Sequence, residues 1–360
     1  PAARSCWHGE TCLLRRWRGM DLIVNSYLLV AAGLAALFVG GELLVRGAVA
    51  AALRLGISAF VVGVVVVGFG TSMPELLVSV RAALAGTPAI ALGNVIGSNI
   101  ANILLIAGIG IAIAPVAALD RANRTDVIVM LVAGLAATGL LFFDTIGRAI
   151  GLGLLVLLAV YLGNAVRSDS DAGAATEQPV AGSGAAAVPV IALLLVGGLA
   201  LLFAGAEMLI NGATAIARGL GISEAVIGLT IVAVGTSLPE LATTLVAAIR
   251  RQGDVAIGNV IGSNIFNILA VGGGASLAVG LTGGTLAVPE QILGFDIWVM
   301  LAAAVVLSLW VFTGRAIGRL TGLVMFGAYI AYIAALAVMN PVDLSAVGNQ
   351  IEAEIEEAAE

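Results

Sequence analysis

The chain has 360 residues, of which 61% are apolar and only 11% are charged, and its mean hydropathy is +1.13. Soluble globular domains carry about 25% charged residues, so this composition excludes an ordinary soluble protein and indicates a polytopic membrane protein. The net charge of −6 comes largely from an acidic C-terminal tail at 341–360, and all basic residues are arginine.

The first residues differ in character from the rest of the chain. Residues 1–19 are polar and rich in arginine, and Met20 directly precedes an apolar run. Two interpretations stay open: an N-terminal extension that is not native, with the true start at Met20, or a genuine basic leader. Cys6, Cys12 and His8 all lie in this segment, at spacings unlike the common zinc patterns. The membrane body therefore has neither histidine relays nor thiol chemistry.

A membrane span needs about 20 mostly apolar residues, and this length predicts about ten transmembrane helices. In chain order they cover 22–45, 57–82, 89–113, 126–143, 147–166, 188–215, 222–248, 254–279, 292–312 and 316–338. The one long polar interruption, 167–187, is rich in Ser, Asp, Gly and Ala and is typical of a flexible linker. We therefore expect two halves, 20–166 and 188–340.

The two halves repeat each other. GTSMPE at 70–75 recurs as GTSLPE at 235–240, and GNVIGSNI at 93–100 recurs at 258–265, always 165 positions later. Each half has five predicted spans, and an odd number makes the second half enter the membrane from the opposite side. The sequence thus predicts an all-α membrane fold of two five-helix repeats with inverted topology.

Arginine placement sets the expected orientation. With the first span starting outside, the inner loops hold nine arginines and the outer loops hold three: Arg46, Arg54, Arg121, Arg124, Arg167, Arg250, Arg251, Arg315 and Arg319 against Arg81, Arg148 and Arg218. The positive-inside rule then predicts both termini outside, in a prokaryotic inner membrane.

The GTSMPE motif combines a helix breaker with oxygen ligands. Pro74 cannot donate a backbone hydrogen bond to the carbonyl of Gly70, so the helix should open there. Glu75 lies four residues after Thr71 on the same face, next to Ser72, and these oxygens suit a hard cation such as Ca²⁺ or Na⁺. The second copy offers the same groups: Thr236, Ser237, Pro239 and Glu240.

The GNVIGSNIxN motif adds neutral oxygens. Ser98 and Asn102 are four residues apart and share a helix face, as are Ser263 and Asn267. Two carboxylates plus several neutral oxygens match the 6 to 8 ligands that Ca²⁺ prefers.

A single TSxP sequence is often only a helix kink stabilised by hydroxyl groups, and Ser/Asn patterns often serve helix packing. A glutamate at the same point of both copies favours a cation site at the repeat interface. Glu42, by contrast, has Arg46 four residues away as a simple partner.

These paired motifs resemble the two α-repeats of the sodium/calcium exchanger family, within the calcium/cation antiporter superfamily. The resemblance covers nearly the whole membrane body. It implies ten helices in inverted repeats, with ions bound midway by the second, third, seventh and eighth helices. It also implies residue roles: Glu75 and Glu240 as central ligands; Thr71, Ser72, Thr236 and Ser237 as flanking ligands; Ser98, Asn102, Ser263 and Asn267 as outer-coordination and sodium-site residues.

One position departs from the family pattern. Potassium-dependent relatives, and some prokaryotic ones, carry Asp where this chain has Asn267, so a third fixed charge is missing and potassium transport is disfavoured. Calcium/proton exchangers typically replace the TS before the proline and glutamate, so the resemblance favours sodium as the counter-ion.

The expected function is therefore Na⁺/Ca²⁺ antiport by alternating access, with Ca²⁺ and Na⁺ as transported ions and without a cofactor. The alternatives are Ca²⁺/H⁺ antiport and, from a different class, an intramembrane hydrolase using paired glutamates, although the GxGD motif of membrane aspartyl proteases is absent. We expect no enzyme activity. The expected partners are the lipid bilayer and inorganic cations, with no nucleic acid and no obligatory protein partner.

Overall fold

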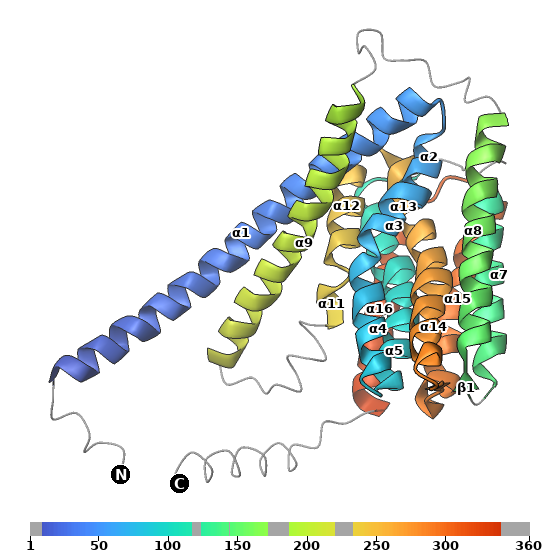
Figure 1. Cartoon of the computed structure of the whole chain (residues 1–360). Helices are drawn as coiled ribbons and strands as arrows, with labels where there is room; N and C mark the ends of the chain where they lie inside the picture. The colour runs from blue at the N-terminus through green and yellow to red at the C-terminus, as the bar shows by residue number, and fades with distance from the viewer. Residues whose placement is uncertain (1–8, 117–123, 144, 172–186, 220–232, 340–360) are drawn as a thin grey trace.

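The computed structural model is almost entirely helical and describes residues 9–116, 124–143, 145–171, 187–219 and 233–339 (Figure 1). Within these residues, eight helices are long and apolar enough to span a membrane, and a ninth span is a pair of helices bent by 42°. The predicted span at 222–248 lies partly outside the described residues, and its described part ends in the short apolar helix Leu238–Ile249. The prediction of about ten membrane helices is confirmed in this form.

The first half contains α1 to α8. Its elements are α1 (Gly9–Leu55), α2 (Ala59–Val62), η1 (Gly63–Gly68), α3 (Phe69–Thr71), α4 (Met73–Leu84), α5 (Pro88–Ile100), η2 (Ala101–Ala107), α6 (Gly108–Ile113), α7 (Arg124–Leu141), β1 (Thr145–Ile146) and α8 (Arg148–Asp171), where η denotes a π-helical segment. α1 thus extends into the predicted N-terminal extension, and α8 extends into the predicted linker, whose residues 172–186 lie outside the described part.

The second half follows the same order. Its elements are α9 (Val188–Gly219), α11 (Ala233–Gly235), α12 (Leu238–Ile249), α13 (Gly253–Phe266), η4 (Asn267–Gly272), α14 (Gly273–Leu281), β2 (Leu286–Ala287), η5 (Ile292–Asp296), α15 (Ile297–Phe312) and α16 (Arg319–Met339). The predicted acidic tail, 341–360, is outside the described residues.

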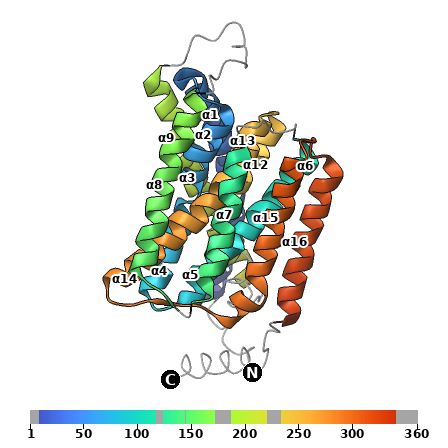
Figure 2. The ribbon, with the colours of Figure 1, turned by 90° about the vertical axis from the view of Figure 1, so that its right-hand side faces the viewer.

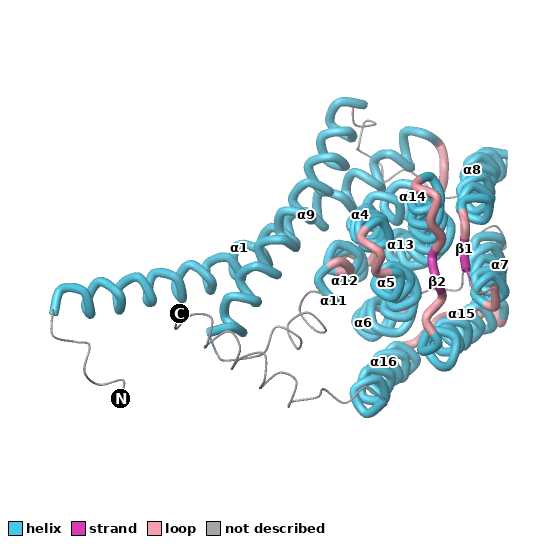
Figure 3. The backbone as a smooth tube through the Cα atoms, turned by 60° about the horizontal axis from the view of Figure 1, so that its bottom comes forward, coloured by secondary structure: helices cyan, strands magenta, loops and turns pink. Residues whose placement is uncertain are grey.

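Helices of the first half pack against helices of the second half. α1 packs along α9, α13 packs against α2 and η1, and the outer helices pair as α8 with α14 and α6 with α16 (Figures 1 and 2). A short antiparallel pairing of β1 with β2 ties the loop before α8 to the loop after α14 (Figure 3). α5 and α13, which carry the GNVIGSNI copies, therefore lie in the centre of the molecule.

Glycines make the α1–α9 contact close, and they do so with two-fold symmetry. A Cβ on Gly33 would lie 2.8 Å from the carbonyl oxygen of Gly205, and one on Gly40 would lie 2.9 Å from that of Gly198. Gly198 and Gly205 are the repeat equivalents of Gly33 and Gly40. The contact of Gly33 with Gly205 is therefore related to the contact of Gly198 with Gly40 by the two-fold symmetry of the repeat. Small residues allow membrane helices to approach this closely, where packing rather than the hydrophobic effect holds them together.

Two buried tyrosines tie the outer helices of each half. The Tyr161 hydroxyl on α8 donates to Asp126 on α7 at 2.6 Å, and the Tyr332 hydroxyl on α16 donates to Asp296 of η5 at 3.0 Å. Both carboxyl groups are thereby partnered inside the membrane region, where a bare charge is costly.

We expect Gly198→Ala to destabilise the protein, because its Cβ would lie 2.7 Å from the backbone nitrogen of Leu44. Overpacking of this kind costs about 1–3 kcal/mol. The neighbouring Gly197→Ala is the matched control, since no described atom lies within 4 Å of its Cβ position. Thermal unfolding in detergent, followed by size-exclusion chromatography, should give a lower midpoint for Gly198→Ala alone; equal midpoints would contradict the assigned helix contact.

Candidate cation site

The two proline motifs interrupt their helices at the same point. Ser72 separates α3 from α4 with φ −81° and ψ 4°, and Ser237 precedes α12 with φ −88° and ψ 7°. Pro74 and Pro239 follow in the first turn of the continuing helix, where the missing N–H costs nothing. The predicted opening of the helix at GTSMPE is confirmed. It places a glutamate in the first turn of both α4 and α12.

The two glutamates are joined crosswise through serines of the opposite half. The Ser237 hydroxyl donates to Oε1 of Glu75 at 3.3 Å, and the Ser72 hydroxyl donates to Oε1 of Glu240 at 3.3 Å. Glu75 is fully buried and Glu240 is 1% exposed. Two carboxylates therefore sit between the halves, and each is oriented by a neutral hydroxyl rather than by an arginine.

Several oxygens around these carboxylates have no hydrogen-bond partner among the described residues. They include the second carboxylate oxygen, Oε2, of both Glu75 and Glu240, and the hydroxyl of Thr236. The side-chain amides of Asn102 and Asn267 also lack a partner within the described part of the chain. Buried polar atoms in proteins are nearly always satisfied, so this set of unpartnered atoms fits a bound polar ligand.

The π-helical segments bring these asparagines to the opposite half. Asn102 lies in η2, which packs against α12, and Asn267 begins η4, which packs against α4. Each asparagine is thus carried on a segment that touches the helix bearing the other half's glutamate. π-helical turns are frequent at functional sites because they redirect side chains within a helix.

The remaining predicted residues lie around the same centre. The Thr71 hydroxyl is 3.2 Å from Oδ1 of Asn259 and 3.4 Å from the Ser263 hydroxyl, so α3 and α13 meet there. Ser98 is buried and its hydroxyl lies 3.5 Å from Oδ1 of Asn94. All ten predicted site residues are buried or half-buried at the repeat interface. Their role as ligands stays a prediction.

Sequence reasoning missed Asn94 and Asn259, the second residues of the two GNVIGSNI copies. The Asn94 amide donates to the backbone carbonyl of Glu75 at 3.1 Å and to Ser79 at 2.9 Å. The Asn259 amide does the same with Glu240 at 3.3 Å and Thr244 at 2.9 Å. Each asparagine therefore fixes a glutamate-bearing helix to the central helix of its own half. Their recurrence at identical positions was the signal available in the sequence.

The donor set is made for a hard cation. Among the described residues there is no group of three or more His, Cys, Asp or Glu side chains that could hold a metal ion, so the negative charge comes from two carboxylates alone. Hydroxyl, amide and carboxylate oxygens suit Ca²⁺ and Na⁺, whereas nitrogen and sulfur ligands suit transition metals. The donor set therefore matches the ligand preference of an alkali or alkaline-earth cation.

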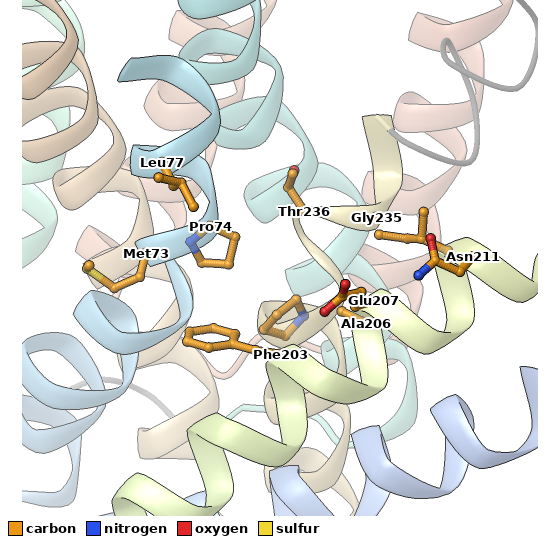
Figure 4. A pocket seen from close by; sticks show the side chains of 11 residues that line it. Met73, Pro74, Leu77, Phe203, Ala206, Glu207, Asn211, Gly235 and Thr236 are labelled. Carbon is orange, nitrogen blue, oxygen red and sulfur yellow. The ribbon is translucent and has the colours of Figure 1, made fainter. Parts of the chain in front are cut away.

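A cavity of about 450 Å³ opens beside this site, between α4, α9 and the start of α12 (Figure 4). Thr236 and the prolines of both motifs line it, together with apolar side chains such as Phe203 and Leu77. The cavity thus borders residues of both proline motifs, and Gly235 of α11 also lines it.

Replacing Asn94 or Asn259 with alanine should destabilise the protein to a similar extent, because each change leaves a buried carbonyl and a buried hydroxyl without their donor. An unsatisfied buried group costs about 1–3 kcal/mol. Ser276→Ala is the control, since the Ser276 hydroxyl bonds only within its own helix, to the carbonyl of Gly272. Unfolding midpoints without added calcium should fall for the two asparagine variants; an effect no larger than that of the serine control would refute the bracing role.

Comparison with known sequences supports the same assignment. The model of the sodium/calcium exchanger protein family matches residues 25–166 and 190–338, which are the two halves. The chain is 37% identical to the putative antiporter CaxA of Alkalimonas amylolytica, over 86% of this chain and 98% of the relative. It is 32% identical to the sodium/calcium exchanger MaX1 of Methanosarcina acetivorans, over 88% of this chain and 99% of the relative.

The fold has a close counterpart among solved structures. The sodium-calcium exchanger NCX_Mj, soaked with 10 mM Na⁺ and zero Ca²⁺, superimposes with a TM-score of 0.77 at 33% identity, covering 87% of this chain and 99% of that chain. The duplicated motifs, the crossed glutamates and these matches lead to one conclusion. The chain is an integral membrane protein and belongs to the sodium/calcium exchanger family of cation antiporters.

Proposed function

We propose that this protein exchanges Na⁺ for Ca²⁺ by alternating access. The observation that carries the proposal is the crossed pair of glutamates, each held by a serine of the other half and each with one oxygen free of partners among the described residues. A site formed by both halves opens to one side or the other when the halves rock against each other.

The charge of the site supports competition between the two ions. Two carboxylates are neutralised by one Ca²⁺ or by two Na⁺, so the ions displace one another. Asn267 supplies a neutral amide where some relatives have a third carboxylate, and this argues against a further monovalent cation such as K⁺. If a third Na⁺ binds, transport moves net charge, and each charge is driven by about 2.3 kcal/mol per 100 mV of membrane potential.

Sodium rather than protons is the proposed counter-ion because of the hydroxyls around the carboxylates. Ser72 and Ser237 touch the glutamates directly, and Thr71 lies at the α3–α13 contact. Such neutral oxygens add ligands for a metal ion, whereas a proton on a carboxyl group needs none. Two relatives, MaX1 and NCX_Mj, are named as sodium/calcium exchangers.

We further propose that the glutamate pair has no hydrolytic role. The symmetry of the serines and asparagines serves ion coordination, and it gives neither carboxylate a distinct part as acid or base. The bilayer and inorganic cations then suffice as partners.

Purified protein in sodium-loaded proteoliposomes should take up ⁴⁵Ca²⁺ when the outside is sodium-free, and should not do so under a pH gradient without sodium. Glu75→Gln and Glu240→Gln should each reduce uptake to background, because each carboxylate supplies half of the charge that opposes Ca²⁺. Glu290→Gln, at an exposed position in the helical turn that precedes η5, is the matched control. Uptake driven by protons alone would favour Ca²⁺/H⁺ exchange, and wild-type uptake in either glutamate variant would reject the site.

We propose the orientation with both termini outside, in a prokaryotic inner membrane. The C-terminal ends of α1 and α12 lie at the upper side in Figure 1, and this side carries Arg54 in the last turn of α1 and Arg250 and Arg251 directly after α12. Arg315 follows the C-terminal end of α15. The last turn of α4, with Arg81, and the start of α8, at Arg148, lie at the lower side. The positive-inside rule makes the arginine-rich side cytoplasmic.

Single cysteines at Arg148 and Arg315, in a background without Cys6 and Cys12, should react with an impermeant maleimide from opposite faces of the membrane. The cysteine at position 148 should react in intact cells, and the one at 315 only after permeabilisation. Reaction of both from one face would contradict the inverted repeat, whereas the reverse assignment would overturn only the orientation.

A further inference from the structure

The repeat contains one pair of glutamates outside the central site, Glu42 and Glu207, and their surroundings differ. Glu42 on α1 is neutralised by two arginines: Nε of Arg46 donates to Oε1 at 2.5 Å, and Nε of Arg250 donates to Oε2 at 2.7 Å. Both carboxylate oxygens are engaged, and one of the two arginines follows α12. This ion-pair cluster joins α1 to the end of α12.

The second copy keeps the carboxylate and loses both arginines. The position equivalent to Arg46 is Asn211, and the position equivalent to Arg250 is Ala85. Glu207 is exposed, and the described part of the chain provides no ion pair to it. The duplication has therefore left one face with a neutralised carboxylate and the other with a bare one.

Glu207 lines the cavity that borders the cation site. Figure 4 shows its carboxylate beside Asn211 and facing Thr236 across the cavity. It is the sole charged side chain among the described lining residues, and the walls are formed mainly by Met73, Leu77 and Phe203. Thr236 also lines the cavity, and its hydroxyl is buried without a partner among the described residues, so the cavity borders the motif directly.

A charge in such surroundings acts at long range. Apolar walls of low dielectric focus the field of a charged group into a cleft and raise the local concentration of ions of opposite sign, increasing on-rates by about 10- to 1,000-fold for strongly charged clefts. A single carboxylate gives the lower end of this range, and dissolved salt screens it.

We propose that Glu207 is a cation-recruiting residue at the outer entrance, drawing Ca²⁺ into the cavity that leads to the glutamate pair. Glu42 cannot do the same at the inner face, because Arg46 and Arg250 neutralise it. The inference rests on the proposed calcium transport and on the proposed orientation, which the cysteine labelling tests separately, but not on the identity of the counter-ion.

Calcium/calcium exchange tests it, since this reaction needs no sodium or proton coupling. Initial rates of ⁴⁵Ca²⁺ entry into right-side-out vesicles loaded with unlabelled calcium should show a KM for outer calcium about three- to tenfold higher in Glu207→Gln, with an unchanged maximal rate. The difference should shrink at high ionic strength, and Glu207→Asp should restore most of the wild-type KM.

The ion pair of Glu42 with Arg46 suggests a second variant, at the equivalent position Asn211. Asn211→Arg supplies the partner that Glu42 has, so it should raise the outer KM as Glu207→Gln does, while Asn211→Gln should leave it unchanged. An unchanged KM in Glu207→Gln and Asn211→Arg would overturn the inference, and so would a lower maximal rate at constant KM. Absence of calcium exchange in the wild-type protein would instead reject the proposed function.

Discussion

Burial of two carboxylates at the contact between the halves is the constraint on which the rest of the structure depends. An ionised side chain at the bilayer centre costs about 2.5–3.5 kcal/mol even on the most lenient scale. Glu75 and Glu240 each accept a hydrogen bond from one serine hydroxyl, at 3.3 Å, and no arginine of the described residues pairs with them, so these contacts offset only part of that cost. In the proposed function, a bound cation offsets the remainder. A binding site whose empty form is costly, and which either one divalent or two monovalent cations can neutralise, is suited to exchange.

Two backbone features make this arrangement possible. The helix break at Ser72 and Ser237 frees the turn before each proline, so a carboxylate and hydroxyls point to one centre rather than around a helix. The asparagine amides of Asn94 and Asn259 then fix the carbonyl of each glutamate to the neighbouring central helix. The interruption of each helix is thus held in place beside its glutamate. Such second contacts orient ligand groups in metal sites generally.

The spans, the breaks and the convergence of both motifs on one interface were predictable, because each depends on a local pattern or on the strict offset of 165 residues. The role of Asn94 in fixing α4 to α5 was not predictable. It depends on the distance between the two helices, and the spacing of residues in the sequence does not give that distance. The Asp126–Tyr161 and Asp296–Tyr332 pairs were missed for another reason. Their members are 170 and 171 positions apart between the halves, so insertions have moved them out of the repeat register.

The central glutamate pair is symmetric between the two halves, whereas the surroundings of Glu42 and Glu207 are not. Crossed serines and equivalent asparagines surround the two glutamates alike in both halves, so the proposed site offers the same cations the same oxygens from either side. Differences between the two faces must then arise from residues that the repeat has not kept equal. One such difference is the pair Arg46 and Arg250, whose repeat equivalents are Asn211 and Ala85. The two arginines neutralise the glutamate of the first half, and the second half has no such partners at the equivalent positions. A duplicated protein can in this way keep one chemistry of binding while each entrance acquires its own electrostatic character.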